Sequence, residues 1–354
     1  MHYRYLVILL TALLIFILTD CSGVTSKAAQ RYTPHLNDNV SYLDTADNGF
    51  SRGWRGHERA DPMAWFDAHT HLNKKCTTLA LAKEAIDFWR KEFGFTDITG
   101  AAIIGFPGSG LFDYAPTDTS IAAYVWLLPD NPDIKLIDSL YREKRIKGVK
   151  LHMRKIYGSG LDYKIMDSKE WHAVYEKCGQ LGIPILWHLN QRHSSPELVY
   201  GEDKSNTWQK LNYTNADVLK WFETVAKRHS KTNIILAHFN FMGYDSLGAL
   251  LDRHPNIYTD GSSAWLIGEY HTLTDREKSL IGSFAIKYQD RIMFASDFSY
   301  HVPDPLKSTR YRVEHYQSGI RFIMQLELPS KVLSKIAYRN ALKILNMNQS
   351  FVGF

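Results

Sequence analysis

Cysteine is scarce in this chain of 354 residues, which has only Cys21, Cys76 and Cys178. Three cysteines without a CxxC spacing exclude a disulfide-stapled scaffold and give no indication of a zinc ribbon or a thiol redox site. The chain also lacks a block of Lys and Arg, because its net charge of +5 is spread over 42 basic and 37 acidic residues. We therefore expect no nucleic-acid partner.

Nucleotide-binding signatures are missing as well. No GxGxxG follows the first predicted strand, and the phosphate-loop pattern GxxxxGK[ST] does not occur. The glycine-rich stretch Gly105–Gly110 stands alone and is more typical of a tight turn than of a phosphate cradle. A hydrophobic content of 45% and a charged content of 22% exclude disordered, collagen-like and coiled-coil classes. Histidine, with 15 residues, is the informative excess.

Residues 1–21 are predicted to be a signal peptide. A charged start with Arg4 precedes the apolar run Leu6–Leu18, which is shorter than the roughly 20 residues that a membrane-spanning helix needs. The sequence LTDC at residues 18–21 resembles a bacterial lipoprotein signal, in which the cysteine is lipidated, although Asp20 stands where that pattern has a small residue. An uncleaved N-terminal anchor is the alternative.

We accordingly expect the protein to be secreted across the inner membrane of a bacterium. A lipidated Cys21 would anchor it to the membrane, facing the periplasm or the cell exterior. Residues 22–62 are polar and have no sustained period, so they are predicted to be a tether.

Beyond residue 62, short apolar runs alternate with amphipathic stretches, which is typical of parallel βα units. Apolar residues at three- and four-residue steps predict helices at 78–93, 168–181, 215–229 and 275–288. The predicted strands are residues 64–68, 100–106, 122–128, 146–152, 183–188, 233–238, 256–260 and 291–297. These elements predict a single-domain α/β fold over residues 63–350, a (β/α)8 TIM barrel, with an open doubly wound sheet as the alternative.

Histidine or aspartate ends several of the predicted strands. His69 and His71 are two residues apart in an extended segment, so their imidazoles project to the same side. His188, His238 and Asp297 each follow a run of apolar residues. In a barrel these strand ends converge on one mouth. Imidazoles with one carboxylate suit zinc or iron, with manganese as a further candidate, and predict a catalytic metal site.

Residues 64–346 contain, in order, the motifs DAHTHL, IKGVKLH, IPILWH, NIILAH, IYTDGSS, RIMFASDF and YRNALKIL. This ordered set resembles the metal-dependent amidohydrolase superfamily, specifically its family 2 branch. It implies a metal held by His69, His71, His188 and Asp297, with Asp297 and His238 as catalytic residues. In binuclear relatives a carboxylated lysine bridges two ions, which gives Lys150 and His238 as the second-metal set. The likeness to family 2 favours one ion.

The resemblance implies hydrolysis of C–N or ester bonds of a small molecule, here an amide, a cyclic amide or a lactone. A divalent metal lowers the pKa of bound water from 15.7 to about 7 and polarises a carbonyl. Asp297 would take the proton of the water, and His238 would hydrogen-bond the carbonyl oxygen as charge develops there. Asp67 is predicted either to brace an imidazole or to close the strand. His152 would contact the substrate or cap its strand.

Two other functions stay open. A non-oxidative decarboxylase of an aromatic or unsaturated acid would need cations for the carboxylate, for which Arg154, Arg192 and Arg310 are candidates. A catalytically silent secreted binding protein is disfavoured, because no metal-ligand position has been replaced. The segment 189–215 is long for a simple connection and is predicted to be a lid or a binding wall.

Overall fold

The structure is a computed structural model that describes residues 64–92, 98–158, 161–190, 200–202, 208–262, 272–302 and 319–348. All of these residues belong to one compact unit, Tyr42–Phe354. The predicted signal peptide and tether lie outside the described residues, so both stay predictions. Among the described residues, no helix combines the length and the apolar composition that a bilayer-spanning segment needs.

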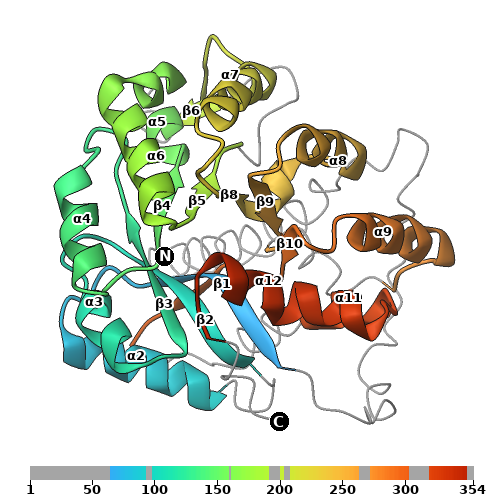
Figure 1. Cartoon of the computed structure of the whole chain (residues 1–354), viewed down its shortest axis with the longest axis horizontal. Coiled ribbons are helices and arrows are strands. Elements are labelled where there is room, and N and C mark those ends of the chain that lie inside the picture. The colour runs from blue at the N-terminus through green and yellow to red at the C-terminus, as the bar shows by residue number, and fades with distance from the viewer. Residues whose placement is uncertain are drawn as a thin grey trace, which may run out of the picture. The chain divides into compact units, whose positions relative to one another are not determined.

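A curled parallel sheet forms the centre of the fold (Figure 1). Its strands are β1 (Trp65–Leu72), β2 (Ile98–Gly105), β3 (Ile121–Trp126), β4 (Gly148–His152), β5 (Ile185–His188), β8 (Ile234–Leu236), β9 (Ile257–Asp260), β10 (Ile292–Met293) and β11 (Phe298–Tyr300). Their order is β10-β9-β8-β5-β4-β3-β2-β1-β11. A separate antiparallel pair, β6 (Tyr200–Glu202) and β7 (Trp208–Lys210), lies in the long segment after β5.

The two ends of the sheet come from one stretch of chain. β10 pairs with β9, and β11, which begins five residues after β10 ends, pairs with β1 on the other side. Further backbone hydrogen bonds join the same stretch to β1, from Ala68 N–H to the Phe294 carbonyl and from Asp297 N–H to the His69 carbonyl. The strand order is therefore that of the predicted (β/α)8 barrel, with the eighth strand divided into two short pieces.

Helices cover the outer face of this sheet in Figure 1. The α-helices are α2 (Leu79–Glu92), α3 (Leu111–Tyr114), α4 (Ile134–Arg142), α5 (Arg154–Gly158), α6 (Lys169–Leu181), α7 (Asn215–Arg228), α8 (Tyr244–Arg253), α9 (Asp275–Lys287), α11 (Ser330–Ser334) and α12 (Asn340–Ile344). Shorter helical turns are η1 (Ala115–Thr117), η2 (Tyr163–Asp167), η3 (Ala237–Phe241) and η5 (Lys335–Arg339). The four helices predicted from periodicity correspond to α2, α6, α7 and α9, each with its ends within about one residue of the prediction.

Capping residues explain why these helices begin where they do. The Thr214 hydroxyl accepts a hydrogen bond from Asp217 N–H while the Asp217 carboxylate accepts one from Thr214 N–H, which is a capping box at the start of α7. Thr274 and Glu277 form the same arrangement at the start of α9. At the other end of α6, Gly182 adopts the left-handed conformation at φ 65° that a terminating glycine provides. Local chemistry thus fixes the helices that alternate with the strands.

Side chains on alternate strand positions fill the inside of the sheet. Tyr124 and Leu186 are completely buried there, together with smaller residues of the neighbouring strands. Helix α12 adds Leu342 and Leu345, next to its last residue, to the same cluster. Because this interior is packed with apolar side chains, polar groups that point inward are expected only at the rim of the sheet.

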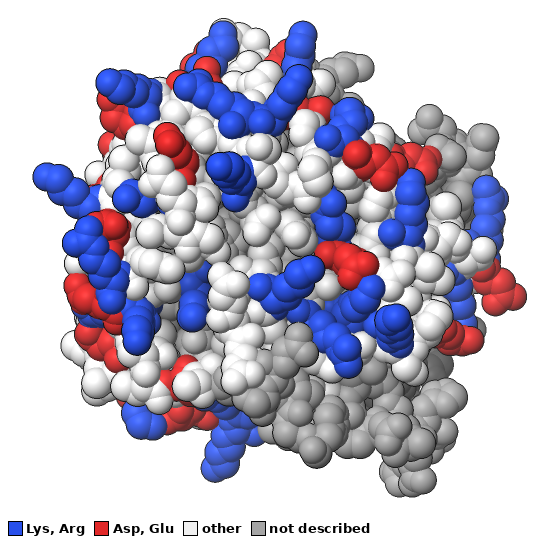
Figure 2. All heavy atoms as spheres, viewed as in Figure 1, with Lys and Arg blue, Asp and Glu red and all other residues white. Residues whose placement is uncertain are grey.

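Charged side chains of both signs are present on the face shown in Figure 2. Several form exposed ion pairs, such as Arg253 with Glu223 at 2.7 Å and Lys287 with Asp252 at 2.9 Å. Exposed pairs of this kind stabilise a fold by no more than about 1 kcal/mol each. The fold therefore depends chiefly on its apolar core.

We expect Gly148→Ala to destabilise the fold by about 1–3 kcal/mol, the usual range for overpacking a filled core. A Cβ at this position in β4 would lie 2.2 Å from Cε1 of the buried Tyr124 ring. Gly282→Ala in α9 is the matched control, because its Cβ would meet nothing closer than 3.9 Å and alanine favours a helix by up to about 1 kcal/mol. Urea unfolding of the two variants measures the difference, and equal midpoints would contradict this description of the core.

Candidate active site

A bulge in β1 turns two histidines toward the inside of the barrel. Residues Asp67 to Thr70 of β1 pair with Ala101 to Ile103 of β2, so β1 has one extra residue there. The extra residue shifts the alternation of side chains by one position, because successive side chains in a strand point to opposite faces. Ala68 faces the core, so regular alternation would point His69 outward. With the extra residue, His69 and His71, in the second half of β1, both point inward.

Asp297 meets these histidines from the break between β10 and β11. Its Oδ1 lies 3.0 Å from His71 Nε2 and 3.4 Å from His69 Nε2. Its backbone has φ 61°, a left-handed conformation that is uncommon outside glycine. The three donor atoms lie within 4.8 Å of one another, and two imidazole nitrogens with one carboxylate oxygen are donors that zinc accepts. The residues present therefore fit a divalent metal.

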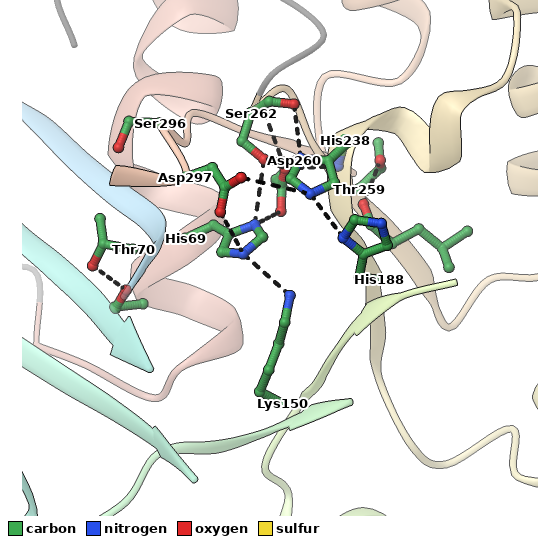
Figure 3. Close-up of polar contacts among 12 residues, drawn as sticks. His69, Thr70, Lys150, His188, His238, Thr259, Asp260, Ser262, Ser296 and Asp297 are labelled. Atoms are coloured by element: carbon green, nitrogen blue, oxygen red, sulfur yellow. Dashed lines mark hydrogen bonds and ion pairs between the residues drawn. The ribbon is translucent and has the colours of Figure 1, made fainter. Parts of the chain in front are cut away.

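His238 and His188 adjoin this group. The predicted sixth strand is shorter than expected, so His238 lies beyond β8, in η3, with φ 61°. Its Nε2 lies 3.9 Å from Asp297 Oδ2 and 3.1 Å from His188 Nδ1 (Figure 3). The structure thus brings His69, His71, His238 and Asp297 together directly, and connects His188 to them through His238.

Lys150 of β4 also points into the site. It is fully buried, and its Nζ lies 3.1 Å from His69 Nε2. Burial lowers the pKa of Lys150 to about 8, although the carboxylates of Asp297 and Asp260 oppose the shift. A lysine amine that is partly neutral near pH 8 is compatible both with donation to His69 and with the carboxylation seen in binuclear relatives.

Burial also sets the charge of the imidazoles. It lowers the pKa of His69, with Lys150 adding to the shift, and lowers the pKa of His238 to about 4. The pKa of His188 falls well below its ordinary value for the same reason. These imidazoles are neutral at pH 7 and keep the lone pair that a metal ligand needs. Burial opposes the charge of Asp297, yet His69, His71 and His238 hold the pKa of its carboxyl well below its ordinary value.

A column of stacked rings forms one side of the mouth. Phe106 stacks on Trp126 at a centroid distance of 4.6 Å, and Trp126 stacks on His152 at 5.5 Å. His152 stacks in turn on His188 at 4.0 Å. His152 therefore belongs to a wall of rings that runs along the ends of neighbouring strands and ends at His188. The indole N–H of Trp126 has no hydrogen-bond partner among the described residues, which leaves a donor in this wall.

Asp67 takes the strand-closing role of the two predicted for it. Its Oδ1 accepts hydrogen bonds from His69 N–H at 3.1 Å and from Ser296 N–H at 3.0 Å. It thereby ties the end of β1 to the break in the eighth strand.

Asp260, at the end of β9, was not among the predicted site residues. It is fully buried and lies 3.0 Å from His69 Nδ1. The sequence contained a signal for it, because Asp260 is the last residue of the predicted strand 256–260, as His188 and His238 are of theirs.

Some predicted features fall outside the described part of the chain. Arg192 and Arg310 lie there, as do residues 191–199 and 203–207 of the segment 189–215. Only the backbone of β6 and β7 is described, and the side chain of Arg154 is not described either. The predicted lid and the predicted carboxylate-binding arginines therefore stay predictions.

Comparison with known proteins finds a family model that matches most of the chain. A family model described as amidohydrolase, of the family 2 type, matches residues 113–347, a segment that contains His188, His238 and Asp297 and begins after His69 and His71. No curated protein matches the chain.

Solved structures share the fold at low sequence identity. A probable 2-pyrone-4,6-dicarboxylic acid hydrolase from Acinetobacter baumannii with citric acid bound is 11% identical, with 80% of this chain and 100% of that chain covered and a TM-score of 0.51. An amidohydrolase from Burkholderia multivorans with bound zinc is 11% identical, with 80% and 100% covered and a TM-score of 0.50. A 2,6-dihydroxybenzoate decarboxylase from Rhizobium is 12% identical, with 80% and 99% covered and a TM-score of 0.51. At these identities the similarity establishes the fold.

Proposed function

The chain belongs to the amidohydrolase family, and from this premise we propose that it is a metal-dependent hydrolase that cleaves an amide, cyclic amide or lactone bond of a small molecule. One observation carries the proposal. His69 Nε2, His71 Nε2 and Asp297 Oδ1 converge within 4.8 Å of one another at the strand ends, where barrel enzymes have their active sites.

We propose that one divalent ion, most simply zinc, is held by His69, His71, Asp297 and His188. A second group of possible donors comprises His69, His238 and Asp260. In that group Asp260 Oδ2 already accepts a hydrogen bond from His69 Nδ1, so these two side chains hold each other. In the first group Asp297 Oδ1 likewise lies 3.0 Å from His71 Nε2, so these contacts fit one ion or two, and the likeness to family 2 is what favours a single ion.

An ion held by these residues would lower the pKa of a bound water and would polarise the scissile carbonyl. Asp297 accepts the proton of the attacking water, since its low pKa keeps it ionised and able to accept. Asp297 Oδ2 is 3.9 Å from His238 Nε2, beyond hydrogen-bond distance, so the proton would pass to that imidazole through one intervening water. His238 then donates a hydrogen bond to the developing oxyanion, and the proton finally goes to the leaving group.

Decarboxylation is the second candidate function, and the ring column of Phe106, Trp126, His152 and His188 favours it, because such a wall suits a flat unsaturated acid. Turnover of a panel of lactones, cyclic amides and aromatic acids in ¹⁸O-water separates the two. Hydrolysis places one ¹⁸O atom in the product carboxyl group, whereas decarboxylation releases carbon dioxide and leaves the remaining product oxygens unlabelled. Absence of both reactions across the panel would favour a binding protein.

We also propose that the protein is a secreted, membrane-anchored lipoprotein, on the basis of residues 1–21. Cys21→Ser is expected to move the protein from the membrane fraction to the soluble fraction while activity is retained, because the first strand begins only at Trp65. Fractionation followed by immunoblotting measures this. Continued membrane association of the variant would indicate an uncleaved N-terminal helix instead.

A further inference from the structure

Asp260 and Ser262 form a buried hydrogen-bonded pair beside His69 and His238 (Figure 3). Both side chains are completely buried. Asp260 Oδ1 accepts hydrogen bonds from Ser262 N–H at 3.0 Å and from His238 N–H at 3.0 Å, and also from the Ser262 hydroxyl. The proposed chemistry uses neither residue, so their burial beside it needs a reason.

The contact with Asp260 decides which nitrogen of His69 carries the proton. An ionised carboxylate only accepts hydrogen bonds. Asp260 Oδ1 accepts hydrogen bonds from two backbone N–H groups, which only donate, and from the Ser262 hydroxyl, so this carboxylate is held as an acceptor. Because Asp260 Oδ2 lies 3.0 Å from His69 Nδ1, that nitrogen must be the donor. The lone pair of neutral His69 is then on Nε2, which faces Lys150 and Asp297.

The surroundings of His238 lead to the same tautomer. Its Nδ1 lies 3.1 Å from the backbone carbonyl oxygen of Ser262, which only accepts, and 2.8 Å from the Ser262 hydroxyl oxygen. The hydroxyl proton of Ser262 goes to Asp260, so its oxygen is free to accept from Nδ1 as well. His238 Nδ1 therefore carries the proton, and the lone pair is on Nε2.

The same arrangement of proton and lone pair extends to His188, at the end of β5. His238 Nε2, as an acceptor, lies 3.1 Å from His188 Nδ1, so His188 Nδ1 carries its proton and His188 Nε2 keeps its lone pair. One carboxylate thus sets the direction of the hydrogen bonds through Ser262, His238 and His188.

We propose that Asp260 and Ser262 are positioning residues that hold His69, His238 and His188 as Nδ1–H tautomers, so that the ε-nitrogen of each carries the lone pair. The metal-affinity part of this inference rests on the proposed function, because it assumes that His69 binds an ion through Nε2. Partners that orient a metal-binding histidine typically change metal affinity 10–100-fold when they are mutated.

The direct test is a two-bond ¹H–¹⁵N correlation spectrum of the purified chain labelled with ¹⁵N-histidine, recorded before and after addition of Zn²⁺. Signals are assigned with His69→Gln and His238→Gln. We expect both histidines to show the Nδ1–H pattern in the wild type. An Nε2–H tautomer at His69 or His238 before Zn²⁺ is added would overturn the proposal, and no variant of Asp260 has to fold for this result.

Zn²⁺ affinity, measured by competition with a chromophoric chelator, is the second test. Asp260→Asn, which keeps the shape of the side chain but removes its charge, is expected to weaken Zn²⁺ binding about 10–100-fold. Thr259→Val is the matched control, since the neighbouring Thr259 hydroxyl is equally buried but donates only to the Leu236 carbonyl, at 2.8 Å. We expect unchanged affinity for this control.

Affinity of Asp260→Asn within twofold of the wild type would also overturn the proposal. Failure of the proposed function looks different: the wild type would then bind no Zn²⁺ or hydrolyse nothing, while the tautomers before Zn²⁺ addition would still be read from the spectrum.

Discussion

Asp297→Ala is expected to lower kcat/KM by about 10²–10⁴-fold through loss of the general base alone, and further through loss of the metal. Asp297 combines both roles, because its Oδ1 lies 3.0 Å from His71 Nε2 and 3.4 Å from His69 Nε2 while Oδ2 faces His238. Steady-state kinetics on the best substrate of the panel, with metal analysis of the same samples, measure the two losses separately.

Two controls show whether the loss of activity is specific to Asp297. Asp245→Asn removes an exposed carboxylate from the first turn of α8 and is expected to leave kinetics and metal content unchanged. Far-ultraviolet circular dichroism of Asp297→Ala should match the wild type, because strand-end ligands lie outside the packed interior. A variant that keeps full turnover would remove Asp297 from the mechanism.

His238→Asn is expected to lower kcat about 10²–10³-fold, the usual effect of removing one group that stabilises a developing oxyanion. Asparagine is the best replacement, because residue 238 has φ 61° and asparagine adopts this left-handed conformation more readily than alanine. The variant should retain its metal, since His238 lies outside the group of His69, His71 and Asp297.

Metal content and kinetics therefore distinguish the two roles open to His238. A loss of turnover with full metal content indicates a group that acts on the substrate. A parallel loss of metal would identify His238 as a ligand of a second ion and would contradict the single-ion proposal.

Much of the fold could be predicted because its elements depend on local chemistry. The α7 and α9 boundaries follow from capping boxes at Thr214 and Thr274, and the strands follow from short apolar runs between amphipathic helices. The convergence of His69, His71 and Asp297 was likewise predictable, since the carboxyl ends of barrel strands meet at one mouth.

What could not be predicted depends on contacts between distant parts of the chain. The bulge that turns His69 inward arises from pairing between β1 and β2, and the division of the eighth strand arises from pairing with β9 on one side and β1 on the other. The left-handed backbone of His238 is held by the hydrogen bond from its N–H to Asp260, 22 residues away. No local pattern in the sequence reports such contacts.

The number of ions also depends on tertiary contacts, here those of Lys150. In the single-ion proposal the lone pair of His69 Nε2 binds the ion, so the Lys150 amine, 3.1 Å away, only packs beside it. In a binuclear site the same amine would be carboxylated and would bridge two ions. Both arrangements use a lysine of lowered pKa, so the geometry of Lys150 alone is compatible with each.

Metal analysis of the purified protein, alongside His69→Ala, His71→Ala and Asp297→Ala, is the most direct test of the proposed site. After loading with Zn²⁺ and exhaustive dialysis, we expect about one ion per chain in the wild type and much less in each variant, because all three residues are proposed to supply ligands to one open catalytic site. Full metal content in all three variants, or a wild type that retains no metal after loading, would contradict the assignment of His69, His71 and Asp297 as the metal site.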